Sequence, residues 1–331
     1  TCPVPGSTPL TTLPFSIAYS LSKTSLLRQC ISSGLRGEAL RTRPAMSRVD
    51  WARAAWHHRP MRAKRSLGQH FLVSEPVIQR TLEACRREAE GAAGILEIGP
   101  GRGALTGGLC ALGRPFWAVE LDFEMGLELQ EGVPAARVIL GDARELDLAH
   151  VALESGLSPW LLVGNLPYNA ATEILGRVLA SPAHVAAAVV MLQREVAQKL
   201  CAAAGGEGYG QMAAGAAPWW ERQVLFNVKP GAFRPEPAVT SAVCLLRPRT
   251  DPLLPADSIE RYRRFVSRAF AQPRKTLTSH LAAAGLGRGR TEAVLAAAGL
   301  PPDARPGRTP AEAFVALFQL LCEEQGVRSE E

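Results

Sequence analysis

The sequence predicts an α/β fold in which a doubly wound parallel sheet is followed by a small helical domain. The first observation is the apolar run 95–98, interrupted only by Glu97, which breaks into the turn Gly99-Pro100-Gly101-Arg102-Gly103. The second is a neighbouring apolar run, 116–119, which ends at Glu120. Short buried strands that alternate with helical patterns indicate a parallel sheet covered on both faces, and from residue 258 the pattern becomes entirely helical.

The glycine turn predicts a binding site at the carboxyl edge of this sheet. Glycines let the backbone approach a ligand closely and adopt positive φ, and Glu120 can accept hydrogen bonds from both hydroxyls of a ribose. We therefore expect an adenosine-containing cofactor, although a purely structural turn would have a similar sequence. A nicotinamide cofactor favours Gly-x-Gly-x-x-Gly, whereas Glu97 precedes a Gly-x-Gly-x-Gly turn here.

Two more polar segments follow predicted strands. Asp142 comes after the strand 137–140, where it could accept a hydrogen bond from the amino group of a cofactor adenine or serve only as a turn residue or helix cap. The strand 160–164 delivers Asn165-Leu166-Pro167-Tyr168-Asn169 to the same edge. Ligands of open α/β sheets bind at this edge, so both segments are candidates for the site.

The segment 165–168 fits the chemistry of methyl transfer to an adenine amino group. That amine is a poor nucleophile because its lone pair is delocalised into the ring, and two acceptors for its hydrogens favour the tetrahedral nitrogen that attacks a methyl sulfonium. The side-chain oxygen of Asn165 and the backbone oxygen of Leu166 can be those acceptors. Pro167 would stiffen the loop and Tyr168 could stack on the base. An asparagine-capped turn with a core tyrosine is the structural alternative.

The rest of the chain up to residue 250 supplies the other elements of this domain. Helices are expected at 75–89, 104–113, 124–131, 170–179 and 193–204, and strands at 185–192, 223–228 and 242–246. The last two strands should form an antiparallel pair that closes the sheet. Trp219 and Trp220 are expected in a further helix, as core residues. The Pro-rich loop 233–241 begins with Phe233, which could offer a second stacking face or belong to an ordinary surface loop.

Composition argues against several classes of protein. The 331 residues are 47% hydrophobic, as in a packed globular protein, and no apolar run approaches the roughly 18 residues of a membrane-spanning helix. Seven cysteines are scattered without a Cys-x-x-Cys pair, which favours reduced thiols over a disulfide framework or a zinc site. The net charge of +6 suits a polyanionic partner without identifying one.

We divide the chain into a segment 1–60 outside the fold, a domain at 61–250 and a helical domain at 251–331. Residues 1–60 are rich in Pro, Ser, Thr and Arg and contain only two acids. This composition fits an organelle transit peptide or, in the interpretation we prefer, an extension upstream of a start at Met46 or Met61, of which Met61 immediately precedes the domain.

Basic residues gather in the helical domain. Helical spacing places them on the face opposite an apolar stripe, and the segment after the helix extends that face. The residues are Arg261, Arg264, Arg268, Arg274 and Lys275. We expect them to contact RNA phosphates, and a merely solvated helix face is the alternative.

From about residue 66 to 321 the chain resembles the small-subunit rRNA adenine N6,N6-dimethyltransferases of the KsgA type. The ordered motifs that carry this resemblance are Gly68-Gln69-His70-Phe71-Leu72, Glu97-Ile98-Gly99-Pro100-Gly101, Glu120-Leu121-Asp122, Gly141-Asp142-Ala143, Asn165-Leu166-Pro167-Tyr168-Asn169, Gln193-Arg194-Glu195-Val196-Ala197, Tyr209-Gly210, the loop 233–241 and Arg274-Lys275-Thr276-Leu277. The resemblance implies a Rossmann-like methyltransferase domain with a C-terminal α-helical domain. It also implies S-adenosylmethionine as methyl donor and two adjacent adenosines in a hairpin near the 3′ end of small-subunit rRNA as target.

The resemblance also implies residue roles. Cofactor contacts would fall on His70, Leu72, Gly99, Glu120, Asp142 and Asn165. Methyl would pass directly from sulfur to N6 beside Asn165 and Leu166, on a base held by Tyr168 and Phe233, with neither a metal nor a dedicated general base. Two positions depart from the family pattern. His70 stands where Asn is common, and Pro273 stands where many members have Arg, which removes one phosphate contact.

Partners and alternatives follow from these assignments. We expect a monomer acting on the immature small subunit in the cytoplasm, or in an organelle if residues 1–60 are a transit peptide. The nearest alternative acts on large-subunit rRNA, as erythromycin-resistance enzymes do, but the Glu-Ile-Gly-Pro-Gly form and the helical tail favour the small-subunit type. An assembly factor without activity would not need the segment 165–168, and an NAD-dependent dehydrogenase would need a hydride-transfer site.

Overall fold

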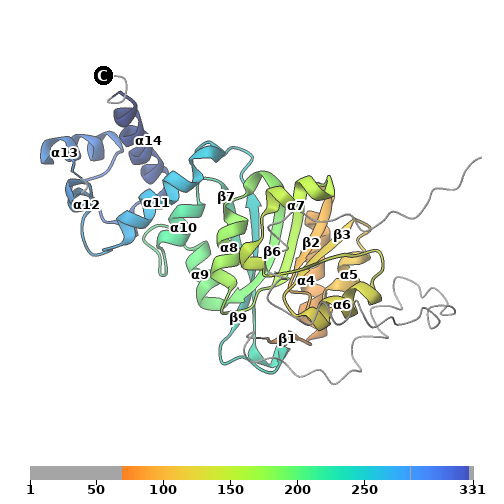
Figure 1. The fold of residues 1–331 in the computed structure, drawn as a ribbon. Coiled ribbons are helices and arrows are strands. Elements are labelled where there is room, and N and C mark those ends of the chain that lie inside the picture. Colours follow the sequence, from red (N-terminus) through yellow and green to blue (C-terminus); the bar gives the residue numbers. More distant parts are fainter. Residues whose placement is uncertain (1–68, 284, 328–331) are drawn as a thin grey trace, which may run out of the picture. The chain divides into compact units, whose positions relative to one another are not determined.

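The computed structural model describes residues 69–283 and 285–327, and its central element is a seven-stranded sheet of order β4-β3-β2-β5-β6-β9-β7. The strands are β2 (Gly94–Ile98), β3 (Phe116–Glu120), β4 (Arg137–Leu140), β5 (Trp160–Asn165), β6 (Val185–Gln193), β7 (Trp220–Val228) and β9 (Ser241–Pro248). β2 to β6 are parallel, and β9 and β7 add antiparallel (Figure 1). The predicted doubly wound sheet and its antiparallel closing pair are confirmed.

Helices cover both faces of the sheet because its strands are apolar on both sides. Along β2, Leu96 and Ile98 enter one core cluster, while Ile95 enters the other. The second cluster includes α4 (Glu75–Glu88), α5 (Thr106–Cys110) and α6 (Phe123–Gly132), and the first includes α7 (Leu148–Ser155), α8 (Ala171–Leu179), α9 (Arg194–Cys201) and α10 (Gln211–Ala216). This is why β2 and β3 are buried along their whole length.

The strand order reverses beside β2. The chain runs outward from β2 to β3 and β4, then returns to place β5 on the other side of β2. The loops after these strands therefore diverge at their carboxyl ends and leave a crevice, which is where open α/β sheets bind ligands.

Close packing at this crevice requires a glycine in β5. A Cβ built on Gly164 would lie 2.6 Å from the backbone oxygen of Ile98, the last residue of β2. We expect Gly164→Ala to lower the free energy of unfolding by about 2 kcal/mol, because backbone must move to admit the methyl group. Gly91 is exposed with nothing within 4 Å of its added Cβ, so Gly91→Ala should change stability by under about 0.5 kcal/mol. Urea unfolding of both variants checks this difference, and equal losses would contradict it.

A separate two-stranded pair joins distant parts of the chain. β1 (Phe71–Leu72) runs antiparallel to β8 (Phe233–Arg234), and the Val73 amide continues the pair by donating to the Ala232 oxygen at 2.8 Å. We call this unit the β1–β8 pair. Two residues are too few to show a strand pattern, so the sequence did not predict it.

The helical part is built on α11 (Ile259–Phe270), followed by α12 (Leu277–Ala283), α13 (Arg288–Ala297) and α14 (Ala311–Val327). The predicted apolar stripe of α11 is buried, and Tyr262 packs edge-on against Trp219 at 5.5 Å and against Phe318 at 5.4 Å between ring centroids. One core cluster runs from the sheet into these helices, so the boundary at residue 250 stays a prediction. The segment 1–60 lies outside the described residues.

Some local predictions were wrong. Trp219 and Trp220 are core residues as expected, but α10 ends at Ala216 and β7 begins at Trp220. Pro218 explains this, since proline lacks the backbone N–H that would continue the hydrogen bonds of the helix. The helix predicted at 104–113 covers only Thr106–Cys110, and the glycines within it lower helix propensity.

Candidate active site

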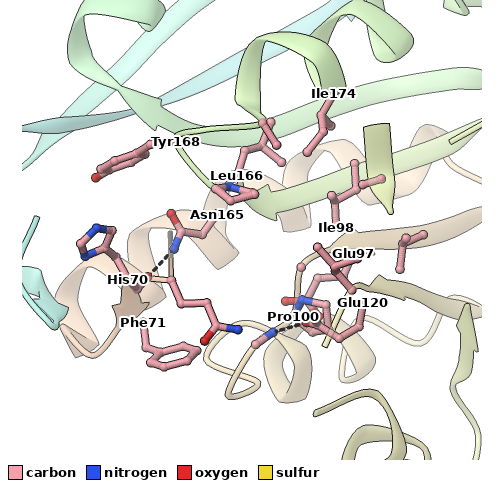
Figure 2. A pocket seen from close by; sticks show the side chains of 18 of the residues that line it. His70, Phe71, Glu97, Ile98, Pro100, Glu120, Asn165, Leu166, Tyr168 and Ile174 are labelled. Carbon is pink, nitrogen blue, oxygen red and sulfur yellow. Dashed lines mark hydrogen bonds between the residues drawn. The ribbon is translucent and has the colours of Figure 1, made fainter. Parts of the chain in front are cut away.

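A cavity opens where β2, β3, β4 and β5 end. All six residues that the sequence assigned to the cofactor line it, as do the assigned Leu166, Pro167 and Tyr168. Figure 2 labels five of these nine: His70, Glu120, Asn165, Leu166 and Tyr168. The six are His70, Leu72, Gly99, Glu120, Asp142 and Asn165. Residues from the N-terminal strand, the glycine turn and three further strand ends thus meet in one place.

Glu120 is fixed at the floor of the cavity by backbone donors. Its Oε2 accepts from the Gly101 amide at 3.1 Å (Figure 2). Its Oε1 accepts from the Asp122 amide at 2.8 Å. Burial raises the pKa of the Glu120 carboxyl, while these two bonds oppose the rise. Gly101 has φ of 53° and would bring a Cβ within 3.3 Å of the Phe71 ring, so glycine is needed there. The arrangement presents a carboxylate beside open backbone, which fits a ribose.

Asp142 is both a helix cap and a cavity residue. Its side chain caps the short 3₁₀ helix η3 (Ala143–Glu145) by accepting from the Arg144 amide at 2.9 Å. The Arg144 guanidinium also donates to Asp142 Oδ2, from Nε at 2.8 Å and from Nη2 at 2.6 Å. These bonds hold the pKa of the Asp142 carboxyl below its usual range. Of the two alternatives that the sequence offered, the helix cap is confirmed, and the ligand contact stays a prediction for a carboxylate that lines the cavity.

The orientation of the Asn165 amide follows from its partner. Asn165 Nδ2 donates to the backbone oxygen of His70 at 2.9 Å (Figure 2). A carbonyl can only accept, so the NH₂ group must face His70, and the side-chain oxygen then points to the other side, where Tyr168 lies. The next residue is fixed too, because the Leu166 amide donates to the Met191 oxygen at 3.1 Å. The site therefore presents an oriented acceptor oxygen.

Tyr168 and Phe233 are placed differently. Tyr168 is half-buried in the cavity wall, and its hydroxyl is 2.5 Å from the Ser241 hydroxyl. Burial raises the pKa of Tyr168. Phe233 is fully buried in the second core cluster and does not line the cavity, because β8 turns its ring inward. The structure does not bring the two predicted stacking residues together.

Glu97 is a cavity residue with an unusual environment. It is fully buried, and its Oε2 accepts from the Thr106 hydroxyl at 2.6 Å. Burial raises the pKa of Glu97 to about 8, although the bond from Thr106 lowers it. The sequence marked Glu97 as part of a motif but gave no sign of this pair, since Thr106 lies beyond the turn.

This pKa predicts a pH-dependent stability for the cofactor-free protein. Because the folded pKa of about 8 exceeds the unfolded value, the stabilising effect of Glu97 is complete below the unfolded pKa and is lost as pH rises through about 8. The Glu97→Gln side chain stays neutral at all pH values. We therefore expect its free energy of unfolding, relative to that of wild type, to rise by about 3 kcal/mol as the pH increases from 5.5 to 8. Urea unfolding at several pH values tests this. A pH-independent difference between the two proteins would refute it.

The five predicted RNA-contacting residues lie outside the cavity, on α11 and the turn that follows it. All are exposed: Arg261, Arg264, Arg268, Arg274 and Lys275. Residues 251–322 contain ten Lys and Arg against six acids. The excess of basic residues elsewhere in the chain lies in 1–68, which hold eleven of the 37 basic residues and only two of the 31 acids. The remaining chain from residue 69 is slightly acidic, so the helical part is a basic region on an otherwise acidic fold.

The described residues show neither a membrane span nor a metal site. Within 69–283 and 285–327, the helices are too short or too polar to cross a bilayer. The same ranges hold no group of three or more His, Cys, Asp or Glu side chains that could bind a metal ion. The described cysteines, Cys85, Cys110, Cys201, Cys244 and Cys322, carry free thiols.

Comparison with known proteins decides the family. The model for the family described as ribosomal RNA adenine dimethylase matches residues 61–322. The chain belongs to this family. It is thus an S-adenosylmethionine-dependent rRNA adenine dimethyltransferase. The cavity fits that cofactor, since a buried carboxylate, Glu120, lines it beside the backbone of the glycine turn at Gly101.

Individual relatives agree with this assignment. The chain is 35% identical over 266 residues to ribosomal RNA small subunit methyltransferase A of Syntrophotalea carbinolica, covering 80% of this chain and 98% of the relative. It is 37% identical to the protein of the same name from Pseudomonas aeruginosa, covering 81% and 97%. Among solved structures it is similar to the 23S rRNA methyltransferase ErmE, with 28% identity, a TM-score of 0.59 and coverage of 76% and 99%.

Proposed function

We propose that this protein dimethylates N6 of two adjacent adenosines in a hairpin near the 3′ end of small-subunit rRNA, during maturation of the subunit. The relatives of 35% and 37% identity carry names for small-subunit methyltransferases, which supports this target. The observation that carries the chemistry is the orientation of Asn165, whose NH₂ group is occupied by the His70 oxygen. Its remaining oxygen is the group that an adenine amine needs as an acceptor.

The last residue of β5 and the loop that follows it have distinct roles in this proposal. The Asn165 side-chain oxygen and the Leu166 backbone oxygen each accept a hydrogen bond from the N6 amino group. These two bonds direct the nitrogen lone pair toward the methyl group. Tyr168 stacks on the extruded base, and Pro167 restricts the loop backbone. Catalysis then consists of positioning and of acceptors already in place. Phe233 is left out, because its ring is fully buried.

The cofactor residues surround the other half of the cavity. S-adenosylmethionine, when bound, supplies the methyl group. Glu120 accepts from the ribose hydroxyls, Asp142 accepts from the adenine amino group, and the backbone at Gly99 admits the rest of the molecule. Leu72 and His70 close the cavity from the N-terminal side.

The RNA would be held by the basic region of the helical part. The exposed cations on α11 and after it neutralise phosphates without reading sequence. We propose that a monomer binds the immature small subunit in this way. Its compartment is the cytoplasm, or an organelle if residues 1–60 act as a transit peptide.

The test supplies the protein with S-adenosylmethionine and with small or large ribosomal subunits from a strain that lacks both methylations. The RNA is then digested and its nucleosides are weighed. We expect N6,N6-dimethyladenosine from small subunits only. Product from large subunits would favour the activity of the erythromycin-resistance type. This outcome is included because the chain is also similar to the 23S rRNA methyltransferase ErmE. Binding to small subunits without product would favour an assembly factor.

A further inference from the structure

His70 connects three parts of the site. Its ring Nδ1 lies 2.8 Å from the backbone oxygen of Pro235, and its own backbone oxygen accepts from Asn165 Nδ2 at 2.9 Å. Its ring centroid lies 5.4 Å from that of Tyr168, with 30° between the planes. Figure 2 shows Tyr168 on the side to which the Asn165 oxygen points, while the Asn165 NH₂ group faces the His70 backbone. One residue thus touches both side chains that handle the adenine.

The backbone that follows His70 is held by the β1–β8 pair. Phe71 is in register with Arg234, and the Phe71 ring lies under the Arg102 guanidinium at 5.0 Å from its centroid. His70 stands just before this pairing begins, and Pro235 stands just after it on the other strand. The bond from the His70 ring to the Pro235 oxygen therefore adds one more contact at the end of the β1–β8 pair. This contact lies at the residue whose backbone carbonyl orients Asn165.

We propose that His70 is a positioning residue for methyl transfer, whose bond to the Pro235 oxygen holds the His70 carbonyl where it orients the Asn165 amide. The inference rests on the proposed function, because it concerns the alignment of Asn165 with N6 of adenine. It assigns the His70 side chain a role in the rate of transfer, in place of the cofactor contact by that side chain that the family resemblance implies for this position.

The chemistry of the bond suggests how to separate it from the ring contact. The Pro235 oxygen only accepts, so Nδ1 must carry a hydrogen. An Asn side chain places its NH₂ on the same γ carbon and can make the same bond, although it lacks the ring. A Phe side chain keeps a ring beside Tyr168 but has no donor. Ala has neither.

The experiment compares His70→Asn, His70→Phe and His70→Ala with wild type. For each protein we would measure the single-turnover rate of methyl transfer to small subunits at saturating cofactor, and the dissociation constant of S-adenosylmethionine by calorimetry. We expect His70→Ala and His70→Phe to slow transfer by about 10-fold or more, because misaligned acceptors lose their effect. His70→Asn should stay within about 3-fold of wild type, and the dissociation constant should change by less than about 3-fold in every variant.

Controls and contrary outcomes are distinct. His184 bonds to the Ser158 hydroxyl at 3.3 Å, at the amino ends of β5 and β6 and away from the cavity at their carboxyl ends. His184→Ala should therefore transfer methyl at the wild-type rate. A slow His70→Asn beside a fast His70→Phe would overturn the proposal in favour of the ring contact. Weaker cofactor binding with an unchanged rate would reduce His70 to a cofactor contact. A wild-type protein without activity would instead defeat the proposed function itself.

Discussion

Replacing Asn165 with Ala is expected to lower the rate of methyl transfer by about 10²- to 10³-fold, which is the usual cost of removing one preorganised polar group from an active site. The physical reason is that N6 loses an acceptor that the His70 carbonyl holds in a fixed orientation. Single-turnover kinetics at saturating S-adenosylmethionine and small subunits measure this step. Binding of the subunit should be nearly unchanged, since Asn165 contributes no charge to the RNA.

Asn165→Asp separates the acceptor from its orientation. Aspartate keeps the acceptor oxygens but places one of them against the His70 carbonyl, where Asn165 now donates at 2.9 Å. Two acceptors repel each other, so this variant should be as slow as Asn165→Ala. Asn227 is an exposed asparagine on β7, and Asn227→Ala serves as the matched control. An active Asn165→Asp protein would show that the amide orientation is irrelevant to the reaction.

The sequence predicted the sheet and the cavity because both depend on local patterns. Apolar runs mark β3, β4 and β5, and the polar residue at or just after the end of each strand lies at the carboxyl edge of the sheet, independently of the loop that follows. This is why Glu120, Asp142 and Asn165 all line the cavity. A parallel sheet converts positions along the chain into positions at one edge.

The features that sequence reasoning missed depend on pairings between particular residues, some far apart in the sequence and some near. The β1–β8 pair joins residues more than 160 positions apart through two residues on each side, and this pairing is what buries Phe233. The bond from Thr106 to Glu97 crosses the glycine turn, and the bond from Arg144 to Asp142 depends on a side-chain conformation. Residue type alone does not determine such contacts. Arg144 still had a signal, since a base two residues after a candidate ligand acid can pair with it.

Replacing Glu120 should affect cofactor binding and leave the methyl-transfer step nearly intact. We expect Glu120→Ala to raise the dissociation constant of S-adenosylmethionine by about 10- to 100-fold, which corresponds to a net loss of about 1.4–2.8 kcal/mol, the size of one hydrogen bond to a charged group. The carboxylate also holds the Gly101 and Asp122 amides, so its loss loosens the turn that the cofactor must contact. Calorimetric titration measures the constant. At saturating cofactor, the rate should stay within about 3-fold of wild type.

Glu120→Gln gives the sharper form of this test. Glutamine has nearly the same shape, yet its NH₂ group must face one of the two amides that now donate to Glu120 at 3.1 Å and 2.8 Å. A donor facing a donor is unfavourable, so the amide cannot reproduce the carboxylate, and cofactor binding should weaken almost as much as in Glu120→Ala. Glu131 is an exposed acid on α6, and Glu131→Ala controls for the loss of one negative charge. If Glu120→Gln bound the cofactor as tightly as wild type, shape alone would suffice at this position. If the Glu120 variants lose affinity for S-adenosylmethionine but keep the rate of methyl transfer, they show the opposite pattern to the Asn165 variants. The Glu120 end of the cavity would then bind the cofactor, and the Asn165 end would carry out the transfer.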